Sequence, residues 1–314
     1  MDPRPGGPMT APYADPGQRV FEEHRRLLFS VAYRLLGSAA DAEDAVQDAW
    51  LKWSAADRSQ VADPKAYLTR IVSNVALERL RSARHKRELY VGPWLPEPIL
   101  TEGDAADAVV DAESVSTALL VVLETLSPLE RAVFVLREAF GFGHAEIAEA
   151  VERSETAVRQ AAHRARAHVQ ARRPRFTADR SRQREVTERF LAATAGGDVN
   201  ALMELLSPDV ALWTDGGGKV RQALRPVRGA ETVAAWFAAL GRVTYQGVDP
   251  ADVRADLVEV NGGPGVVFHA PDRVIATLTF DFDADGRITA LHNVANPDKL
   301  RAVAEGTAYD VGTR

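Results

Sequence analysis

Residues 155–169 place side chains suited to reading DNA along one face of a predicted helix. At about 100° per residue, small apolar side chains fall within one arc, and polar ones lie opposite. The small set is Val158, Ala161, Ala162, Ala165 and Val169, and the polar set is Thr156, Arg159, Gln160 and His163. A cation, an amide and an imidazole suit base edges and phosphates in a major groove. An ordinary surface helix is the alternative interpretation.

The segments before this helix predict a helix-turn-helix unit. Ser127, Pro128 and Glu130 form a capping box that starts a helix. A short helix is expected over 144–151, and Glu152-Arg153-Ser154 separates it from the helix that runs from 155 to about 169. Because capping, turn spacing and the polar face agree, we favour DNA recognition over a plain helical hairpin.

An acidic helix near the N-terminus carries two distinct faces. Its apolar stripe has the spacing of a core face and consists of Val46, Ala49, Trp50 and Trp53. The opposite face presents Asp44, Gln47, Asp48 and Leu51. A solvated acidic face is one interpretation of this group. A protein-docking face is the other, and the leucine among the acids favours it.

A long helix is predicted from Pro64 to about Arg87. Its inward positions are Leu68, Ile71, Val72 and Val75, and its opposite face carries Arg70, Asn74 and Arg81. A basic helix of this kind is either a solubilising surface or a nucleic-acid contact. The helix-turn-helix unit on the same chain favours the nucleic-acid contact.

Composition limits the class of protein. The 314 residues are 46% hydrophobic and 26% charged, which is typical of a soluble chain with two or three domains. The absence of cysteine excludes disulfides, thiol nucleophiles and zinc fingers. Residues 1–17 resemble a disordered Pro/Gly tail without a signal-peptide core, and no apolar run is long enough for a bilayer. A cytoplasmic location with no membrane partner is therefore the default expectation.

The net charge of −6 is unevenly distributed. Residues 1–184 carry 26 basic and 26 acidic side chains, whereas residues 185–314 carry 12 basic and 18 acidic ones. Local basic patches over 79–87 and 153–184 would attract phosphates even without a net positive charge. The acidic C-terminal part is expected to be a poor nucleic-acid partner. It could instead compete with DNA for these patches.

These changes in composition, charge and predicted secondary structure divide the chain into five segments. We expect a tail over 1–17, a helical domain over 18–88, a linker over 89–113, a second helical domain over 114–175 and a mixed domain over 185–305. Three prolines close together near Trp94 forbid helix in the linker. Trp94 is either part of a rigid spacer or an anchor for the C-terminal domain, and we favour the anchor.

The C-terminal segment predicts an α+β domain. Helices are expected over 185–206, with a break at Gly196-Gly197, and over 230–240. Alternating apolar residues over 274–282, a turn at 283–286 and a second strand over 288–294 form a hairpin signature. Helices folded against a curved antiparallel sheet follow from this pattern.

A glycine-rich loop at 215–219 has several interpretations. It is not a P-loop, because it lacks the upstream glycine and Val220 follows Lys219 where Ser or Thr is required. An interdomain contact loop or a simple hairpin turn fits better. Trp213, Asp215, His269, Asp281 and His292 could line a pocket for catalysis or a small ligand, but spacing alone brings no two of them together. We expect no enzyme activity, cofactor or metal site, and small-ligand sensing stays open.

The order of these parts resembles the bacterial extracytoplasmic-function (ECF) sigma factors. Residues 41–50 resemble sigma region 2.2, residues 67–74 resemble regions 2.3 and 2.4, and residues 126–169 resemble region 4. The C-terminal segment is similar to the SnoaL-like family, with the cone fold of nuclear transport factor 2. The motifs at 94–98, 215–219 and 296–300 together resemble SigJ-like sigma factors that carry this extension.

The resemblance implies a role for each predicted surface. Asp44, Gln47, Asp48 and Leu51 would bind the β′ clamp helices of the RNA polymerase core, whose β flap is a further implied partner. The loop 57–63 with Arg70, Asn74 and Arg81 would bind the melted −10 element. Thr156, Arg159, Gln160, His163 and Arg164 would bind the −35 element of promoter DNA. The interdomain regulatory residues would be Trp94, Leu95, Pro96, Glu97, Pro98, Asp215, Gly216, Gly217, Gly218 and Lys219.

The expected function is that of an alternative sigma factor that directs RNA polymerase to specific promoters and is regulated in cis by its extension. Two other classes stay open at this point. One is a DNA-binding regulator that never contacts polymerase, and the other is a DNA-binding module fused to a ligand-sensing or enzymatic cone domain.

Overall fold

The computed structural model describes residues 15–101, 115–172, 179–309 and 311, without the side chains of 83–88. The predicted tail up to residue 14, and the acidic half of the predicted linker from residue 102, lie outside these ranges. No helix in the described ranges is both long and apolar enough to cross a membrane.

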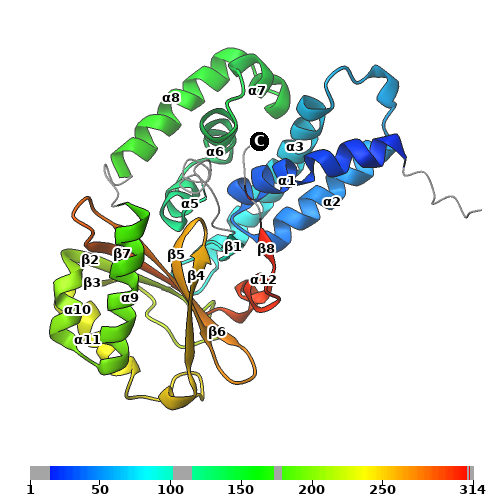
Figure 1. Cartoon of the computed structure of the whole chain (residues 1–314). Coiled ribbons are helices and arrows are strands. Elements are labelled where there is room, and N and C mark those ends of the chain that lie inside the picture. The colour runs from blue at the N-terminus through cyan, green and yellow to red at the C-terminus, as the bar shows by residue number, and fades with distance from the viewer. Residues whose placement is uncertain (1–14, 102–114, 173–178, 310, 312–314) are drawn as a thin grey trace, which may run out of the picture.

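The N-terminal helical unit (residues 15–88) consists of three packed helices (Figure 1). They are α1 (Pro16–Leu36), α2 (Ala39–Ala55) and α3 (Pro64–Glu88), with a 3-10 turn η1 (Arg58–Gln60) before α3. Asp15 caps α1, so the helix includes the last residues of the predicted tail, and Ser38 caps α2. The inward positions predicted for α3 are all buried. In α2, Trp53 is buried, whereas Trp50 is only half-buried and packs edge-on against Phe21.

The second helical unit (residues 115–172) has the predicted helix-turn-helix. Its elements are α5 (Thr117–Glu124), α6 (Pro128–Phe134), a π-helical turn η2 (Val135–Ala139), α7 (His144–Val151) and α8 (Glu155–Arg172). Both halves of the capping box at Ser127 and Glu130 are present. Glu152 adopts φ 53°, which reverses the chain between α7 and α8. Val158, Ala161 and Val169 of the small stripe are buried in one core shared by both helical units, and Ala162 packs against this core while partly buried.

The C-terminal domain (residues 179–311) packs three helices on one face of a curved sheet. The helices are α9 (Arg180–Gly196), α10 (Val199–Leu205) and α11 (Ala230–Leu240). The strands are β2 (Leu206–Asp215), β3 (Val227–Arg228), β4 (Arg254–Val260), β5 (Gly263–His269), β6 (Val274–Phe282), β7 (Ile288–Val294) and β8 (Ala308–Tyr309). Short elements η3 (Pro250–Asp252), η4 (Pro297–Lys299) and α12 (Arg301–Ala304) connect them. The hairpin of β6 and β7 lies as predicted, whereas α9 begins at residue 180 rather than 185.

The predicted linker contributes a strand to the C-terminal sheet. β1 (Leu100–Thr101) pairs antiparallel with β4 and parallel with β8, which gives the order β3-β2-β7-β6-β5-β4-β1-β8. Residues 99–101 can enter a sheet because the last linker proline is Pro98. The linker is therefore part of the C-terminal fold, which the sequence did not predict.

The β4–β5 turn joins all three parts of the molecule at Asn261. Its buried side chain donates to the Tyr33 hydroxyl (2.5 Å) and to the Val115 carbonyl (3.3 Å). Its carbonyl oxygen accepts from the Ile99 amide (3.3 Å), and the Tyr33 hydroxyl donates to the Glu97 carbonyl (2.6 Å). Complete burial raises the pKa of Tyr33, so its hydroxyl keeps its proton. This Asn261 hub links α1, the linker and the start of the second helical unit.

Replacing Tyr33 by Phe should destabilise the fold. The substitution leaves the buried Asn261 amide and Glu97 carbonyl each short of a partner, which costs about 1–3 kcal/mol per unsatisfied group. Urea unfolding followed by circular dichroism should show a lower midpoint. Tyr309→Phe is the matched control, because this ring stacks on Phe29 and its hydroxyl makes no hydrogen bond within the described residues. Equal midpoints for the two variants would contradict the role of the hub.

Candidate nucleic-acid interface

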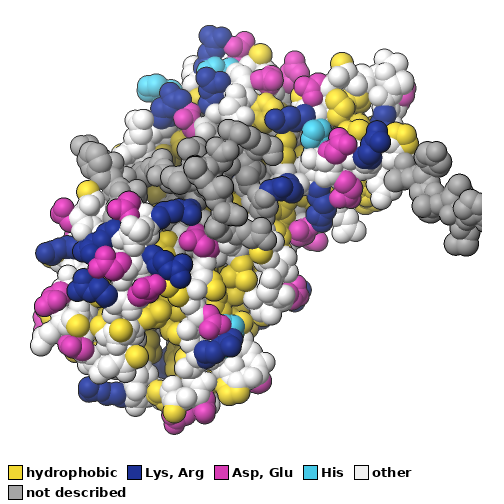
Figure 2. Space-filling view, viewed as in Figure 1, with side chains coloured by type: hydrophobic (Ala, Val, Ile, Leu, Met, Phe, Trp, Pro, Cys, Tyr) yellow, Lys and Arg dark blue, Asp and Glu magenta, His cyan; other side chains and the backbone are white. Residues whose placement is uncertain are grey.

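The polar face of α8 is open to solvent. Thr156, Arg159, Gln160, His163 and Arg164 are all exposed. Dark-blue and cyan side chains gather over α8 in Figure 2. Arg159 pairs with Glu155 (2.5 Å) and Arg164 with Glu130 (2.7 Å), but exposed pairs of this kind are weak. DNA phosphates can therefore replace Glu155 and Glu130 as partners of these two arginines. All five residues predicted to bind the −35 element lie on one accessible face of α8.

The predicted −10 surface lies on α3 and the loop before it. The Arg70 guanidinium lies 5.0 Å from the centre of the Tyr67 ring, and both Arg70 and Arg81 are exposed. Asn74 is half-buried one turn further along the helix. An aromatic ring with a stacked guanidinium is a surface on which unstacked bases bind well.

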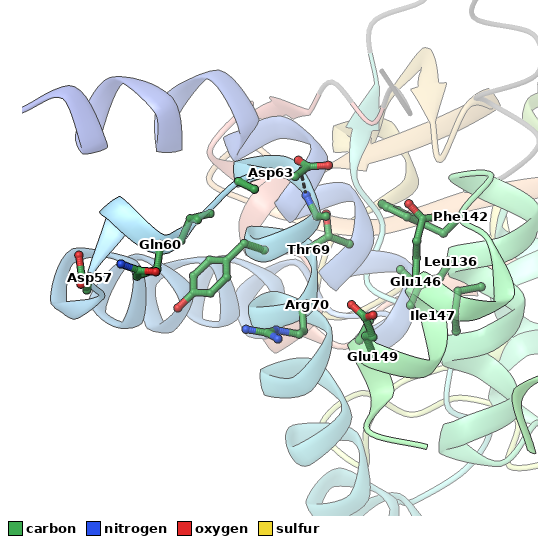
Figure 3. A pocket seen from close by; sticks show the side chains of 15 residues that line it. Asp57, Gln60, Asp63, Thr69, Arg70, Leu136, Phe142, Glu146, Ile147 and Glu149 are labelled. Atoms are coloured by element: carbon green, nitrogen blue, oxygen red, sulfur yellow. Dashed lines mark hydrogen bonds between the residues drawn. The ribbon is translucent and has the colours of Figure 1, made fainter. Parts of the chain in front are cut away.

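This −10 surface faces the second helical unit across a cleft (Figure 3). The cleft encloses a cavity of about 430 Å³. Asp57, Gln60, Tyr67 and Arg70 line one side, and Leu136, Phe142, Glu146, Ile147 and Glu149 line the other. The buried Thr69 hydroxyl in its wall has no hydrogen-bond partner within the described residues. The second helical unit thus borders the predicted −10 surface, while Arg70 and Arg81 remain exposed.

Three carboxylates of the second unit border the predicted DNA contacts. Glu146 and Glu149 line the cleft, and Glu152 Oε1 accepts a hydrogen bond from Asn74 Nδ2 (3.4 Å). These acids lie beside Asn74 because α3 packs directly against α7 in the shared core.

The predicted docking face on α2 is mostly exposed. Asp44, Gln47 and Leu51 are exposed, and Leu51 has 58% of its surface open to solvent. Asp48 is half-buried, because its carboxylate pairs with Arg79 of α3 (2.6 Å), which also lies 3.3 Å from Asp44. The sequence grouped Arg79 with the basic patch for phosphates. In the structure the Arg79 guanidinium instead pairs with Asp48 and Asp44 of α2.

A clasp joins the linker to the C-terminal domain around the buried Asp215 carboxylate. This carboxylate accepts from the Tyr90 hydroxyl (2.5 Å), the Leu95 amide (2.8 Å) and Lys299 Nζ (2.7 Å). It also accepts from the Gly217 amide (3.1 Å) within the glycine-rich loop. Burial and the neighbouring carboxylate raise the pKa of Tyr90, so its hydroxyl remains a donor.

Lys299 completes the clasp from the other side. Its buried ammonium donates to the Leu95 carbonyl (2.5 Å) and lies 4.0 Å from the centre of the Trp94 ring. The residues at 94–98, 215–219 and 296–300 thus meet at one place. The sequence prediction missed Tyr90 as a contact, because no motif marks a tyrosine that precedes the linker prolines.

Glu97 fixes the linker to α2. Its carboxylate accepts from the backbone amides of Ala39 (2.8 Å) and Ala40 (3.3 Å), at the positive N-terminal end of the helix. Burial raises the pKa of Glu97 despite these donors. At the end of the glycine-rich loop, Lys219 forms an exposed ion pair with Asp298 (2.6 Å). The predicted interdomain residues therefore contact both the N-terminal unit and the C-terminal domain.

The residues weighed for an enzymatic pocket make separate contacts. His292 Nε2 lies 3.0 Å from Asp281, His269 Nε2 lies 3.1 Å from Asp256, and Asp215 belongs to the clasp. The space between helices and sheet is filled by Phe190, Phe237, Phe280 and Phe282. Within the described residues, no three His, Asp or Glu side chains are grouped so that they could hold a metal ion.

The comparisons with known proteins match the same three parts. Sigma-70 region 2 matches residues 20–86, Sigma-70 region 4 matches residues 116–169, and the SnoaL-like domain matches residues 187–295. The ECF RNA polymerase sigma factor SigJ of Mycobacterium tuberculosis is 44% identical over 290 residues, which cover 89% of this chain and 92% of SigJ. The probable ECF sigma factor SigI of the same species is 31% identical, over 93% of this chain and 98% of SigI.

A solved structure agrees with these matches. The crystal structure of M. tuberculosis SigJ superposes with a TM-score of 0.69 at 38% identity and covers 90% of this chain and 97% of that one. Sigma domains imply binding to RNA polymerase and promoter DNA. The predicted fold class, two helical sigma domains with an α+β SnoaL-like domain, is thereby confirmed. The chain belongs to the ECF RNA polymerase sigma factors and carries a fused SnoaL-like domain.

Proposed function

We propose that this sigma factor is held closed by its own SnoaL-like domain, so that it can present its −35 helix but not its −10 surface. One observation carries the proposal: Asn74 bonds to Glu152 at the C-cap of α7 and Arg70 borders the cleft between the two units, whereas the polar face of α8 is exposed. Capture of an unstacked base needs access to region 2. Region 4 therefore has to move away before the duplex is opened.

The charges in the cleft strengthen this block. Glu146, Glu149 and Glu152 stand where the phosphates of a bound strand would approach Arg70 and Asn74. Their negative charge repels an incoming DNA backbone. Region 4 acts here as an internal competitor of the −10 strand.

The SnoaL-like domain stabilises the closed arrangement at three points. The clasp around Asp215 and the Asn261 hub hold the linker and α1. The third point is Val311, whose carbonyl accepts from Ser30 Oγ (2.9 Å) and Arg34 Nη2 (3.0 Å) on α1. Arg131 of region 4 in turn donates to the Arg34 carbonyl (3.1 Å). All three points use buried polar groups, which are costly when only one partner is withdrawn.

Release would come from RNA polymerase. The exposed face of Asp44, Gln47 and Leu51 would dock on the β′ clamp helices, while region 4 would move to the β flap and carry α8 to the −35 element. The site of action would then be the cytoplasm. The proposal assigns no catalytic step, cofactor or metal to the SnoaL-like domain, whose buried polar groups serve as contacts instead.

Asp215→Asn should destabilise the fold strongly. It keeps the shape of the side chain but leaves the buried Lys299 ammonium without its counter-charge, which costs about 3–5 kcal/mol for a buried pair. Asp298→Asn is the matched control, because it breaks an exposed pair of Lys219 that contributes at most about 1 kcal/mol. The midpoint of urea unfolding measures the stability of both variants. Similar midpoints would show that the clasp does not hold the linker.

The same substitution should raise transcription. Weakening the clasp shifts the factor toward the open state, so run-off transcription with core polymerase should increase roughly five-fold or more, at the lower end of typical coupling energies. The wild type and Asp298→Asn should give equal transcript. Unchanged transcript from Asp215→Asn would refute closure by the extension, and absence of any start site with the wild type would refute the sigma function itself.

Leu51→Glu should abolish binding to core polymerase without unfolding the protein. Leu51 is exposed, so the substitution removes an apolar contact from the docking face and leaves the core unchanged. Co-elution with core enzyme in gel filtration reports binding. Met203→Glu on α10 introduces the same charge at another exposed apolar position and should bind normally. Normal co-elution of Leu51→Glu would place the docking face elsewhere.

A further inference from the structure

The cleft between the two helical units holds a cavity of the size that small molecules occupy. Its volume of about 430 Å³ lies within the range of roughly 300–1,000 Å³ that is typical of ligand sites. Tyr67 contributes an aromatic ring from α3, and Leu136, Phe142 and Ile147 contribute apolar side chains from the opposite side (Figure 3). A molecule in this cavity therefore contacts both units at once.

A buried hydroxyl in the cavity wall lacks a hydrogen-bond partner. Thr69 lines the cavity from α3 and has only 2% of its surface exposed, and its Oγ1 has no partner in the part of the chain that the structure describes. Buried hydroxyls are normally paired, either with protein atoms or with a molecule that fills the space beside them. The cavity thus offers its occupant one hydrogen bond, as donor or acceptor.

The charge around the cavity is negative. The carboxylates of Asp57, Asp63, Glu146 and Glu149 line it against the single guanidinium of Arg70, so its lining carries a net charge of −3. Two of these carboxylates, those of Asp63 and Glu146, accept from backbone amides at helix starts. None of the four forms an ion pair with a described residue, and no three described acids or histidines are grouped closely enough to hold a metal ion. Dispersed carboxylates of this kind attract an organic cation rather than a metal ion.

We propose that this cavity binds a small organic cation, namely an amine attached to an apolar body. The apolar body lies between Tyr67 and the apolar side chains of the second unit, and the ammonium group faces the carboxylates. Thr69 supplies a hydrogen bond. An aromatic ring together with nearby carboxylates is a combination that suits such cations.

Such a ligand would hold the factor closed. Each helical unit contributes only part of the cavity, so the ligand binds the closed arrangement better than the open one and shifts the population toward it. This step rests on the proposed function, because it assumes that the two units separate on RNA polymerase. Binding to the free protein does not depend on that assumption.

The test measures binding of two probes of similar shape to the full-length chain by equilibrium dialysis. Naphthylmethylamine is a cation at neutral pH, and naphthylmethanol is its uncharged analogue. Glu149→Gln removes one carboxylate from the lining, and Ala66→Leu fills part of the cavity. Glu231→Gln on α11 is the matched control, because it removes the same charge at an exposed position in the SnoaL-like domain.

The amine should bind as one molecule per chain, roughly five-fold or more tightly than the alcohol, because several carboxylates act on one charge. Glu149→Gln should weaken binding of the amine roughly two- to five-fold, the effect of one exposed charge, and leave the alcohol unchanged. Ala66→Leu should abolish binding of both probes, and Glu231→Gln should match the wild type. Equal binding of amine and alcohol, or an unchanged affinity of Glu149→Gln for the amine, would overturn the inference even if Ala66→Leu failed to fold.

Asp215→Asn separates this inference from the proposed function. If the clasp keeps the two units together, this variant should bind the amine more weakly than the wild type, since part of its population lacks the complete cavity. Undiminished binding of the amine by Asp215→Asn would support the site and refute closure by the clasp.

Discussion

The buried ion pair between Asp215 and Lys299 is the interaction on which the closed arrangement depends. Both side chains are almost entirely removed from water, and each also binds the linker backbone at Leu95. A charge in such a place is tolerated only when every donor and acceptor around it is satisfied. Withdrawal of the linker keeps the ion pair, since both partners belong to the C-terminal domain, but it removes the Tyr90 hydroxyl and the Leu95 amide from Asp215 and the Leu95 carbonyl from Lys299. The linker is therefore held by buried hydrogen bonds to a charged pair.

The position of the linker determines what the two sigma regions can reach. With the linker in the clasp and in the sheet through β1, regions 2 and 4 share one core, and the proposed −10 surface borders the cleft between them. The −35 helix lies outside that core on its polar side. Under the proposed function, this packing would let the factor contact duplex DNA before melted DNA. The acids of α7 contribute because they sit on the element that closes the cleft.

Local features of this fold could be predicted from the sequence, whereas its long-range contacts could not. Helical periodicity predicted the buried and polar faces of α8, and the capping residues predicted the start of α6. The alternation of apolar and polar residues predicted the hairpin of β6 and β7. Each of these signals lies within about twenty residues. The pairing of Leu100 with Val260, or the contact of Asn74 with Glu152, depends on which distant segments meet. No local pattern in one sequence encodes that choice.

The same distinction applies to the candidate sites. Exposed faces on α2 and α8 follow from periodicity, but Arg79 and Tyr90 take roles set by partners far away in the chain. The motifs around Trp94, Asp215 and Lys299 were predicted as interdomain residues because they resemble motifs of SigJ-like sigma factors. Only the structure shows that they meet around the Asp215 carboxylate. The Asn261 hub carried no motif, because an asparagine before a glycine is first of all a turn signal.

Distance measurement between the two sigma regions tests the central claim most directly. The chain has no cysteine, so spin labels at Glu22→Cys on α1 and Gln170→Cys on α8 would be the only ones, and both positions are exposed. A closed factor should give one narrow distance distribution in the free protein, a broader one after Asp215→Asn, and a longer distance on core polymerase. The same narrow distribution in all three samples would contradict it.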